Sequence, residues 1–153
     1  MLFQIVPIPA LTEEGLLPAG VHDCTLEELR VLFGRFQGSD ARSRLFARLT
    51  ELMGELMRSE LVAAVVVDGS FVTAKAAPND IDLLLALKPG HNWAADLGAF
   101  DYSLVSSVRV RRRFGFDALV AEDGSELYLR HVKFFSGTRE NPYADKGVLR
   151  IIL

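Results

Sequence analysis

Two short apolar runs, residues 61–67 and 83–87, constrain the fold of this chain more than any other feature. Each run has the length of a buried β-strand, is rich in β-branched residues or leucine, and is bounded by turn residues. A glycine-serine turn follows the first run, and two aspartates stand where the second begins. The pattern predicts two strands joined as a hairpin-like unit, with acids along one edge of the sheet.

Asp80 and Asp82 are the first candidate site residues. Because they are two positions apart, a strand directs both side chains to the same face of the sheet. Two carboxylates this close raise each other's pKa unless a cation lies between them. Carboxylate oxygens suit Mg²⁺ and Mn²⁺, and Mg²⁺ usually takes one or two carboxylates together with substrate phosphates. The pair therefore predicts a Mg²⁺ or Mn²⁺ site.

The turn at Gly69 and Ser70 is the second candidate. Small residues in a turn let successive backbone N–H groups come close to a phosphate. Thr73 and Lys75 follow in the same loop and are further candidates for nucleotide binding. A phosphate site beside a metal site implies a nucleotide ligand.

These residues resemble the core motif of the nucleotidyltransferase superfamily, which includes DNA polymerase beta, the aminoglycoside nucleotidyltransferases and the short bacterial minimal nucleotidyltransferases. The matching positions are Gly69, Ser70, Asp80 and Asp82. The family also carries a third carboxylate on a later strand, and Asp117, inside an apolar run, is the matching acid. The chain as a whole is similar to a small bacterial group of nucleotidyltransferase-like proteins through residues 17–22, 68–73, 111–115 and 146–150.

The resemblance implies transfer of a nucleoside monophosphate from an NTP to an acceptor hydroxyl, with release of pyrophosphate. It implies that Asp80, Asp82 and Asp117 are catalytic and hold Mg²⁺ or Mn²⁺, and that Asp117 positions a second ion or acts as the general base. Short relatives commonly modify or bind a partner protein, often within toxin–antitoxin or phage-defence pairs. A protein acceptor is therefore the first expectation.

Other roles stay open for these residues. Asp82 fits a salt bridge to an arginine, and Asp117 fits a buried structural acid. Asp68 stands where many relatives carry an apolar residue, and the loop lacks the arginines often found at positions 72 and 73. These departures keep open a non-catalytic, partner-binding module with the same fold. An RNA-end nucleotidyltransferase is less favoured, because the net charge is −3 and offers no general attraction to nucleic acid.

The composition favours one domain over residues 1–153, half of them hydrophobic. No apolar run approaches the roughly 20 residues of a membrane span, so no membrane partner is expected. Residues 5–9 are too short and too proline-rich for a signal peptide. A single cysteine, Cys24, excludes an intramolecular disulfide and suits a reducing cytoplasm.

Capping signals and apolar periodicity predict the remaining elements. They are an extended N-terminal arm over residues 1–24, helices over 25–38, 40–59, 101–113 and 125–137, and a final strand over 148–153. The expected fold class is α/β (α+β), a small mixed sheet covered by helices.

The basic run Arg109 to Arg113 has two interpretations. The arginines stabilise a helix C-terminus against its dipole, or one or two of them reach a triphosphate or a polyanionic acceptor. The three histidines, His22, His91 and His131, are scattered and show no metal-ligand spacing.

Overall fold

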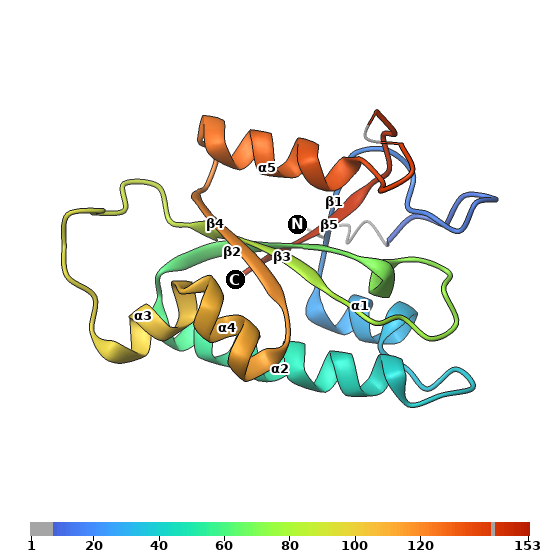
Figure 1. Cartoon of the computed structure of the whole chain (residues 1–153), viewed down its shortest axis with the longest axis horizontal. Helices are drawn as coiled ribbons and strands as arrows, with labels where there is room; N and C mark the ends of the chain where they lie inside the picture. The colour runs from blue at the N-terminus through green and yellow to red at the C-terminus, as the bar shows by residue number, and fades with distance from the viewer. Residues whose placement is uncertain (1–7, 142) are drawn as a thin grey trace, which may run out of the picture.

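The computed structural model of the chain describes residues 8–141 and 143–153 (Figure 1). Within them, one sheet has the strand order β1-β5-β2-β3-β4. The strands are β1 (Val21–Cys24), β2 (Val62–Asp68), β3 (Asp82–Leu87), β4 (Asp117–Glu122) and β5 (Val148–Ile152). Strand β2 is antiparallel to both β3 and β5, whereas β1 is parallel to β5 and β3 is parallel to β4. The hairpin-like unit predicted from the two apolar runs is confirmed.

Helices cover both faces of this sheet (Figure 1). They are α1 (Leu26–Phe33), α2 (Ala41–Ser59), α3 (Ala99–Val105), α4 (Ser107–Phe114) and α5 (Glu126–Ser136), with a short 3-10 turn, η1 (Ser70–Val72). Figure 1 shows α5 alone on one face and the other four helices on the opposite face. The predicted α+β class, a small mixed sheet covered by helices, is confirmed. Among the described residues, no helix is long and apolar enough to cross a membrane.

The two faces of β3 pack into different apolar clusters. Leu83 and Leu85 belong to the large core beneath α1–α4, whereas Leu84 and Ala86 belong to the smaller core beneath α5. Burial on both faces explains why this strand is continuously apolar rather than alternating. Asp82 has the same parity as Leu84, so its side chain lies on the α5 face.

The first helix has the predicted start but an earlier end. The capping box is present, because the Thr25 hydroxyl accepts from the Glu28 N–H at 3.1 Å and Glu28 accepts from the Thr25 N–H at 3.3 Å. The helix was predicted to continue to Gly38, and this is wrong, because it ends at Gly34. A Cβ at Gly34 would lie 2.8 Å from the ring of Phe46, so the glycine lets α2 pack against this end.

The single helix predicted over residues 101–113 is also wrong, because α3 and α4 are separate helices. Ser106 lies between them in extended conformation, and its hydroxyl accepts from the Arg109 N–H at 3.4 Å. Serine is a preferred N-cap, so it starts a second helix where the first one stops. The helices predicted over 40–59 and 125–137 and the final strand are confirmed within one or two residues.

The N-terminal arm packs on the domain, and its end is a strand. Residues 1–7 of the predicted arm lie outside the described residues, and residues 21–24 form β1, which the sequence did not predict. The Ala74 N–H donates to the Gly15 carbonyl and the Gly147 N–H to the Leu17 carbonyl, both at 2.9 Å. A Cβ at Gly147 would lie 2.0 Å from the Pro18 oxygen, so glycine is required for this contact.

Candidate active site

Three aspartates lie side by side across β2, β3 and β4. The strand register pairs Asp68 with Asp82, and Asp82 with Asp117. Paired residues on neighbouring strands direct their side chains to the same face, so this acidic row lies on the α5 face of the sheet. The expectation that Asp117 shares a face with Asp82 is confirmed, and its catalytic role stays a prediction.

Asp80 joins the acidic row from a loop rather than from a strand. It was expected on the strand with Asp82, but β3 begins only at Asp82. Its backbone oxygen accepts from the Phe71 N–H at 3.2 Å, and its carboxylate accepts from the N–H of Ser70 at 3.0 Å and from the Ser70 hydroxyl. Asp80 is therefore hydrogen-bonded to the turn and not to a neighbouring strand. Asp80 and the acidic row nevertheless line one pocket.

Gly69 fixes how closely the turn approaches Asp80 and Asp82. Its φ of +96° belongs to the region that favours glycine. A Cβ at this position would lie 2.9 Å from the Asp80 carbonyl oxygen and 3.1 Å from the Asp82 nitrogen. Any side chain here would push the turn away from the acids. The glycine predicted for phosphate binding therefore has a clear structural role in placing the turn.

The surroundings shift the pKa values of Asp82 and Asp80 in opposite directions. Burial, then the charges of Asp80, Asp68 and Asp117, raises the pKa of Asp82 to about 6, and Lys146 offsets only part of this. Burial alone would raise the pKa of Asp80 as well, but the hydrogen bonds from Ser70 lower its pKa overall. Repulsion of this kind among carboxylates is relieved by a bound cation.

Two cations neutralise the ends of the acidic row. Lys146 forms an ion pair with Asp68, and their side chains are 14% and 8% exposed. Arg111 forms an ion pair with Asp117, and both side chains are about two-thirds exposed. Burial raises the pKa of Asp68, against the effect of Lys146. Among the residues that the structure describes, Asp82, in the middle of the row, forms no ion pair with an arginine or lysine.

The donor set fits Mg²⁺ or Mn²⁺ through Asp80 and Asp82. Both offer hard carboxylate oxygens to one pocket, and the repulsion at Asp82 favours a cation. In the part of the chain described, no three histidine, cysteine or acidic side chains already surround one point. Asp117 fits as a further ligand only after it leaves Arg111.

The backbone N–H groups of the turn are engaged within the chain. The donors of residues 70–75 go to Asp80, Gly69, Ser70, Gly15 and Thr73. The Thr73 hydroxyl donates to the Ser70 carbonyl at 2.6 Å. Gly69, Ser70, Thr73 and Lys75 are not among the lining residues of the acidic pocket. A phosphate would have to displace existing bonds, so nucleotide binding by these four residues stays a prediction.

Arg42 is the site residue that sequence reasoning missed. It is 2% exposed, and its guanidinium donates to the carbonyls of Phe71, Thr73 and Lys75 at 2.5 to 2.7 Å. Its carbon Cζ lies 5.7 Å from the ring centroids of both Phe33 and Phe71. Burial lowers its pKa. Arg42 therefore supports the turn. It lies three residues before Leu45 and seven before Leu49, on the buried stripe of α2, and this spacing is the signal that could have found it.

The arginines of α4 have different partners. Three of them lie in the last turn of the helix, where positive charge opposes the helix dipole, and contact with a triphosphate stays a prediction. Arg113 lies 2.8 Å from the carboxylate of Glu55, which is buried, and it joins α4 to α2. Arg109 lies over the ring of Tyr102. Only Arg111 contacts an acid of the row. Arg113 is thus structural, and Arg111 faces the candidate site.

The acidic pocket has a volume of about 450 Å³. One wall carries the four aspartates, and the rest is formed mainly by the end of α5 and the segment after it. These lining residues are Leu119, Phe134, Phe135, Gly137, Thr138 and Arg139. The pocket therefore combines carboxylates, an arginine and aromatic rings.

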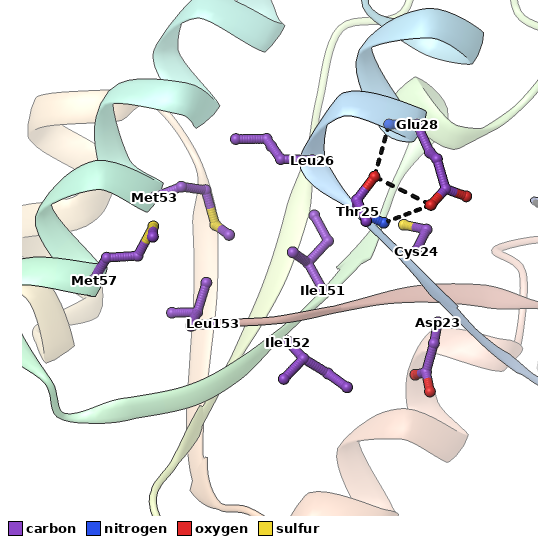
Figure 2. A pocket seen from close by; sticks show the side chains of 10 residues that line it. All are labelled: Asp23, Cys24, Thr25, Leu26, Glu28, Met53, Met57, Ile151, Ile152 and Leu153. Carbon is purple, nitrogen blue, oxygen red and sulfur yellow. Dashed lines mark hydrogen bonds between the residues drawn. The ribbon is translucent and has the colours of Figure 1, made fainter. Parts of the chain in front are cut away.

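A larger pocket of about 560 Å³ lies between β1, β5, α1 and α2 (Figure 2). Figure 2 shows mainly apolar side chains around it, from Leu26, Met53, Met57, Ile151, Ile152 and Leu153. Of its two carboxylates, Glu28 is used by the capping box with Thr25, and Asp23 lies 3.9 Å from the Nε atom of Arg150. Size alone does not make an active site, and this pocket lacks the clustered acids of the smaller one.

The fold and the site define a small α+β domain with a carboxylate-lined pocket at one edge of a mixed sheet. The chain belongs to DUF6932, a family of unknown function whose profile matches residues 9–152. No curated protein and no solved structure matches the chain.

Proposed function

We propose that the protein is a metal-dependent nucleotidyltransferase that moves a nucleoside monophosphate from an NTP to an acceptor hydroxyl. One observation carries the proposal: Asp82 stands in register between Asp68 and Asp117, and Asp80 lines the same pocket. Burial and the charges of the neighbouring aspartates together raise the pKa of Asp82. A raised carboxylate pKa of this origin is typical of sites that bind cations. The resemblance to the nucleotidyltransferase core motif supports the same chemistry.

In this reaction the acceptor oxygen forms a bond to the α-phosphorus, and the bond from that phosphorus to the oxygen bridging the β-phosphate breaks. Pyrophosphate leaves, and the hydroxyl proton passes to Asp117, the proposed general base. Asp80 and Asp82 would hold the Mg²⁺ or Mn²⁺ ion, which would neutralise charge on the phosphates. The two hydrogen bonds from Ser70 favour the ionised form of Asp80 against the effect of burial, and they lower its pKa. Arg111 must release Asp117 before this acid can accept a proton.

We propose a partner protein as the acceptor, within a toxin–antitoxin or defence pair in the cytoplasm. The resemblance to short bacterial nucleotidyltransferases supports this partner. The net charge of −3 does not favour nucleic acid.

The one cysteine is buried, and burial raises the pKa of its thiol to about 12, so Cys24 has little of the reactive thiolate. This agrees with a structural cysteine in a reducing compartment.

The second candidate is a non-catalytic module that keeps the fold and binds a partner. Two observations favour it. Lys146 and Arg111 already neutralise Asp68 and Asp117, and the turn donors are satisfied inside the chain. A site balanced in this way has less need of a metal. The two candidates differ in whether label from an NTP becomes covalently attached to an acceptor.

The test uses NTPs radiolabelled at either the α- or the γ-phosphate, with Mg²⁺ or Mn²⁺. The purified protein is incubated with and without the product of the neighbouring gene. We expect transfer of the α label only, abolished in Asp82→Asn and retained in Asp96→Asn, an exposed acid outside the pocket. Transfer of the γ label would indicate a kinase. Metal-independent nucleotide or partner binding with no transfer would favour the non-catalytic module.

A further inference from the structure

We propose that Phe134, at the end of α5, is the platform on which the base of the bound NTP stacks, and that Arg139 contacts its phosphates. This subsite rests on the proposed function and deepens it. It lies on the wall of the acidic pocket that faces the four aspartates. Asp80 and Asp82, with the cation that they would hold, would bind the triphosphate, which leaves the α5 wall for the base.

Phe134 has the exposure and the place that a stacking platform needs. Its side chain is 74% exposed and lines the acidic pocket. The next residue, Phe135, is 5% exposed and packs in the core beneath α5, with the two ring centroids 6.2 Å apart. Phe135 therefore anchors this end of the helix, while Phe134 keeps an open ring at the pocket.

Arg139 supplies positive charge at the acidic pocket, which Lys75 of the turn does not line. It is exposed in the segment after α5 and lines the same pocket as Phe134. Its charge acts on Asp80, the acid nearest the turn. A guanidinium matches the geometry of phosphate oxygens and stays charged at any physiological pH. The pocket thus pairs an aromatic ring for the base with a cation for the phosphates.

The same wall offers little to read the edge of a base. The Thr138 hydroxyl already lies 3.3 Å from the Asn141 carbonyl oxygen and 3.0 Å from the Asn141 N–H. The neighbouring lining residues Leu119, Phe135 and Gly137 have no polar side-chain group. Recognition then depends on stacking, which every base can do and which grows with the area of the ring system. We expect all four NTPs to bind, with ATP and GTP tighter than CTP and UTP.

Calorimetry in Mg²⁺ with ATP, CTP and inorganic tripolyphosphate tests this subsite. Loss of one stacked aromatic weakens binding of a base roughly 5- to 150-fold. We therefore expect Phe134→Ala to weaken ATP by at least about 5-fold on that scale, while leaving tripolyphosphate unchanged and Phe134→Tyr near the unmodified protein. Arg139→Ala is expected to weaken both ligands. Leu129→Ala is the matched control, because Leu129 is also on α5, is 60% exposed and does not line the pocket.

Three results distinguish failure of this subsite from failure of the proposed nucleotidyltransferase function. Unchanged ATP affinity in Phe134→Ala, with tripolyphosphate still bound, would overturn the stacking subsite and leave the proposed function intact. Equal losses in Phe134→Ala and Leu129→Ala would also overturn it, because the effect would be one of the helix and not of the ring. If the unmodified protein binds neither ATP nor tripolyphosphate, both proposals are wrong.

Discussion

Replacing Asp82 with asparagine is expected to stabilise the metal-free protein. Burial and the charges of Asp80, Asp68 and Asp117 raise the Asp82 pKa from 3.8 to about 6. A pKa change of this size corresponds to about 3 kcal/mol between the charged and neutral forms. Because Asp82 is only half-buried, solvent screening reduces this, and we expect a gain of about 1–2 kcal/mol in the free energy of unfolding. The midpoint of thermal unfolding should rise by roughly 2–8 °C.

The gain depends on pH in a defined direction. Below the ordinary pKa of 3.8, Asp82 is protonated in both the folded and the unfolded chain, so Asp82→Asn changes little. As the pH rises toward about 6, the unfolded chain ionises first, and the unmodified protein loses stability relative to the variant. Above that pH the difference is complete and constant.

Urea unfolding at several pH values between 4 and about 8, in EDTA, measures this difference. Asp68→Asn is the contrasting variant, because it leaves the largely buried Lys146 without its carboxylate and should destabilise the protein. A drop in the stability of Asp82→Asn, or a gain that does not change with pH, would refute the reasoning. The drop would make Asp82 a structural acid, and the pH-independent gain would show that its charge is not the cause.

Three further predictions concern the surroundings of the acidic row. Arg111→Ala should tighten Mn²⁺ binding by roughly 2- to 5-fold, the scale of one exposed ion pair, because Arg111 competes for Asp117. The neighbouring variant Arg112→Ala should leave Mn²⁺ binding unchanged, and calorimetry with Mn²⁺ alone distinguishes the two. Asp117→Asn should lower nucleotidyl transfer by about 100-fold or more and leave NTP binding largely intact; full activity would remove Asp117 from the site. Arg42→Met should lower the free energy of unfolding by about 2–5 kcal/mol, because it leaves three loop carbonyls without donors. Arg44→Met should have little effect, and urea unfolding and limited proteolysis at residues 70–75 compare the two variants.

Sequence could predict the strands that carry the site because their signal is local. The runs that became β2 and β3 are apolar throughout, since both faces of each strand are covered. The resemblance implied a third carboxylate on a later strand beside the pair, and Asp117 does lie beside Asp82. By contrast, β1 has four residues and little apolar content, and its pairing with β5 depends on a segment more than a hundred residues away.

Tertiary contacts decided what the sequence could not. Two glycines, Gly34 and Gly38, could end the first helix, and the close approach of Phe46 selects the first. Lys146 and Asp68 are 78 positions apart, so no spacing rule connects them. Arg42 lies on the buried stripe of α2, which predicts its burial but not its partners. Its role depends on carbonyls of the turn that only the folded chain brings within reach.

Calorimetry of ATP binding, with Mg²⁺ and then with EDTA, tests the central claim most directly. The claim is that Asp80 and Asp82 bind a metal–NTP complex in the acidic pocket. We predict binding in Mg²⁺ that is lost in EDTA and lost in Asp80→Asn, while Asp96→Asn binds as the unmodified protein does. Equally tight ATP binding in EDTA, or unchanged Mg²⁺-dependent binding in Asp80→Asn, would contradict the claim.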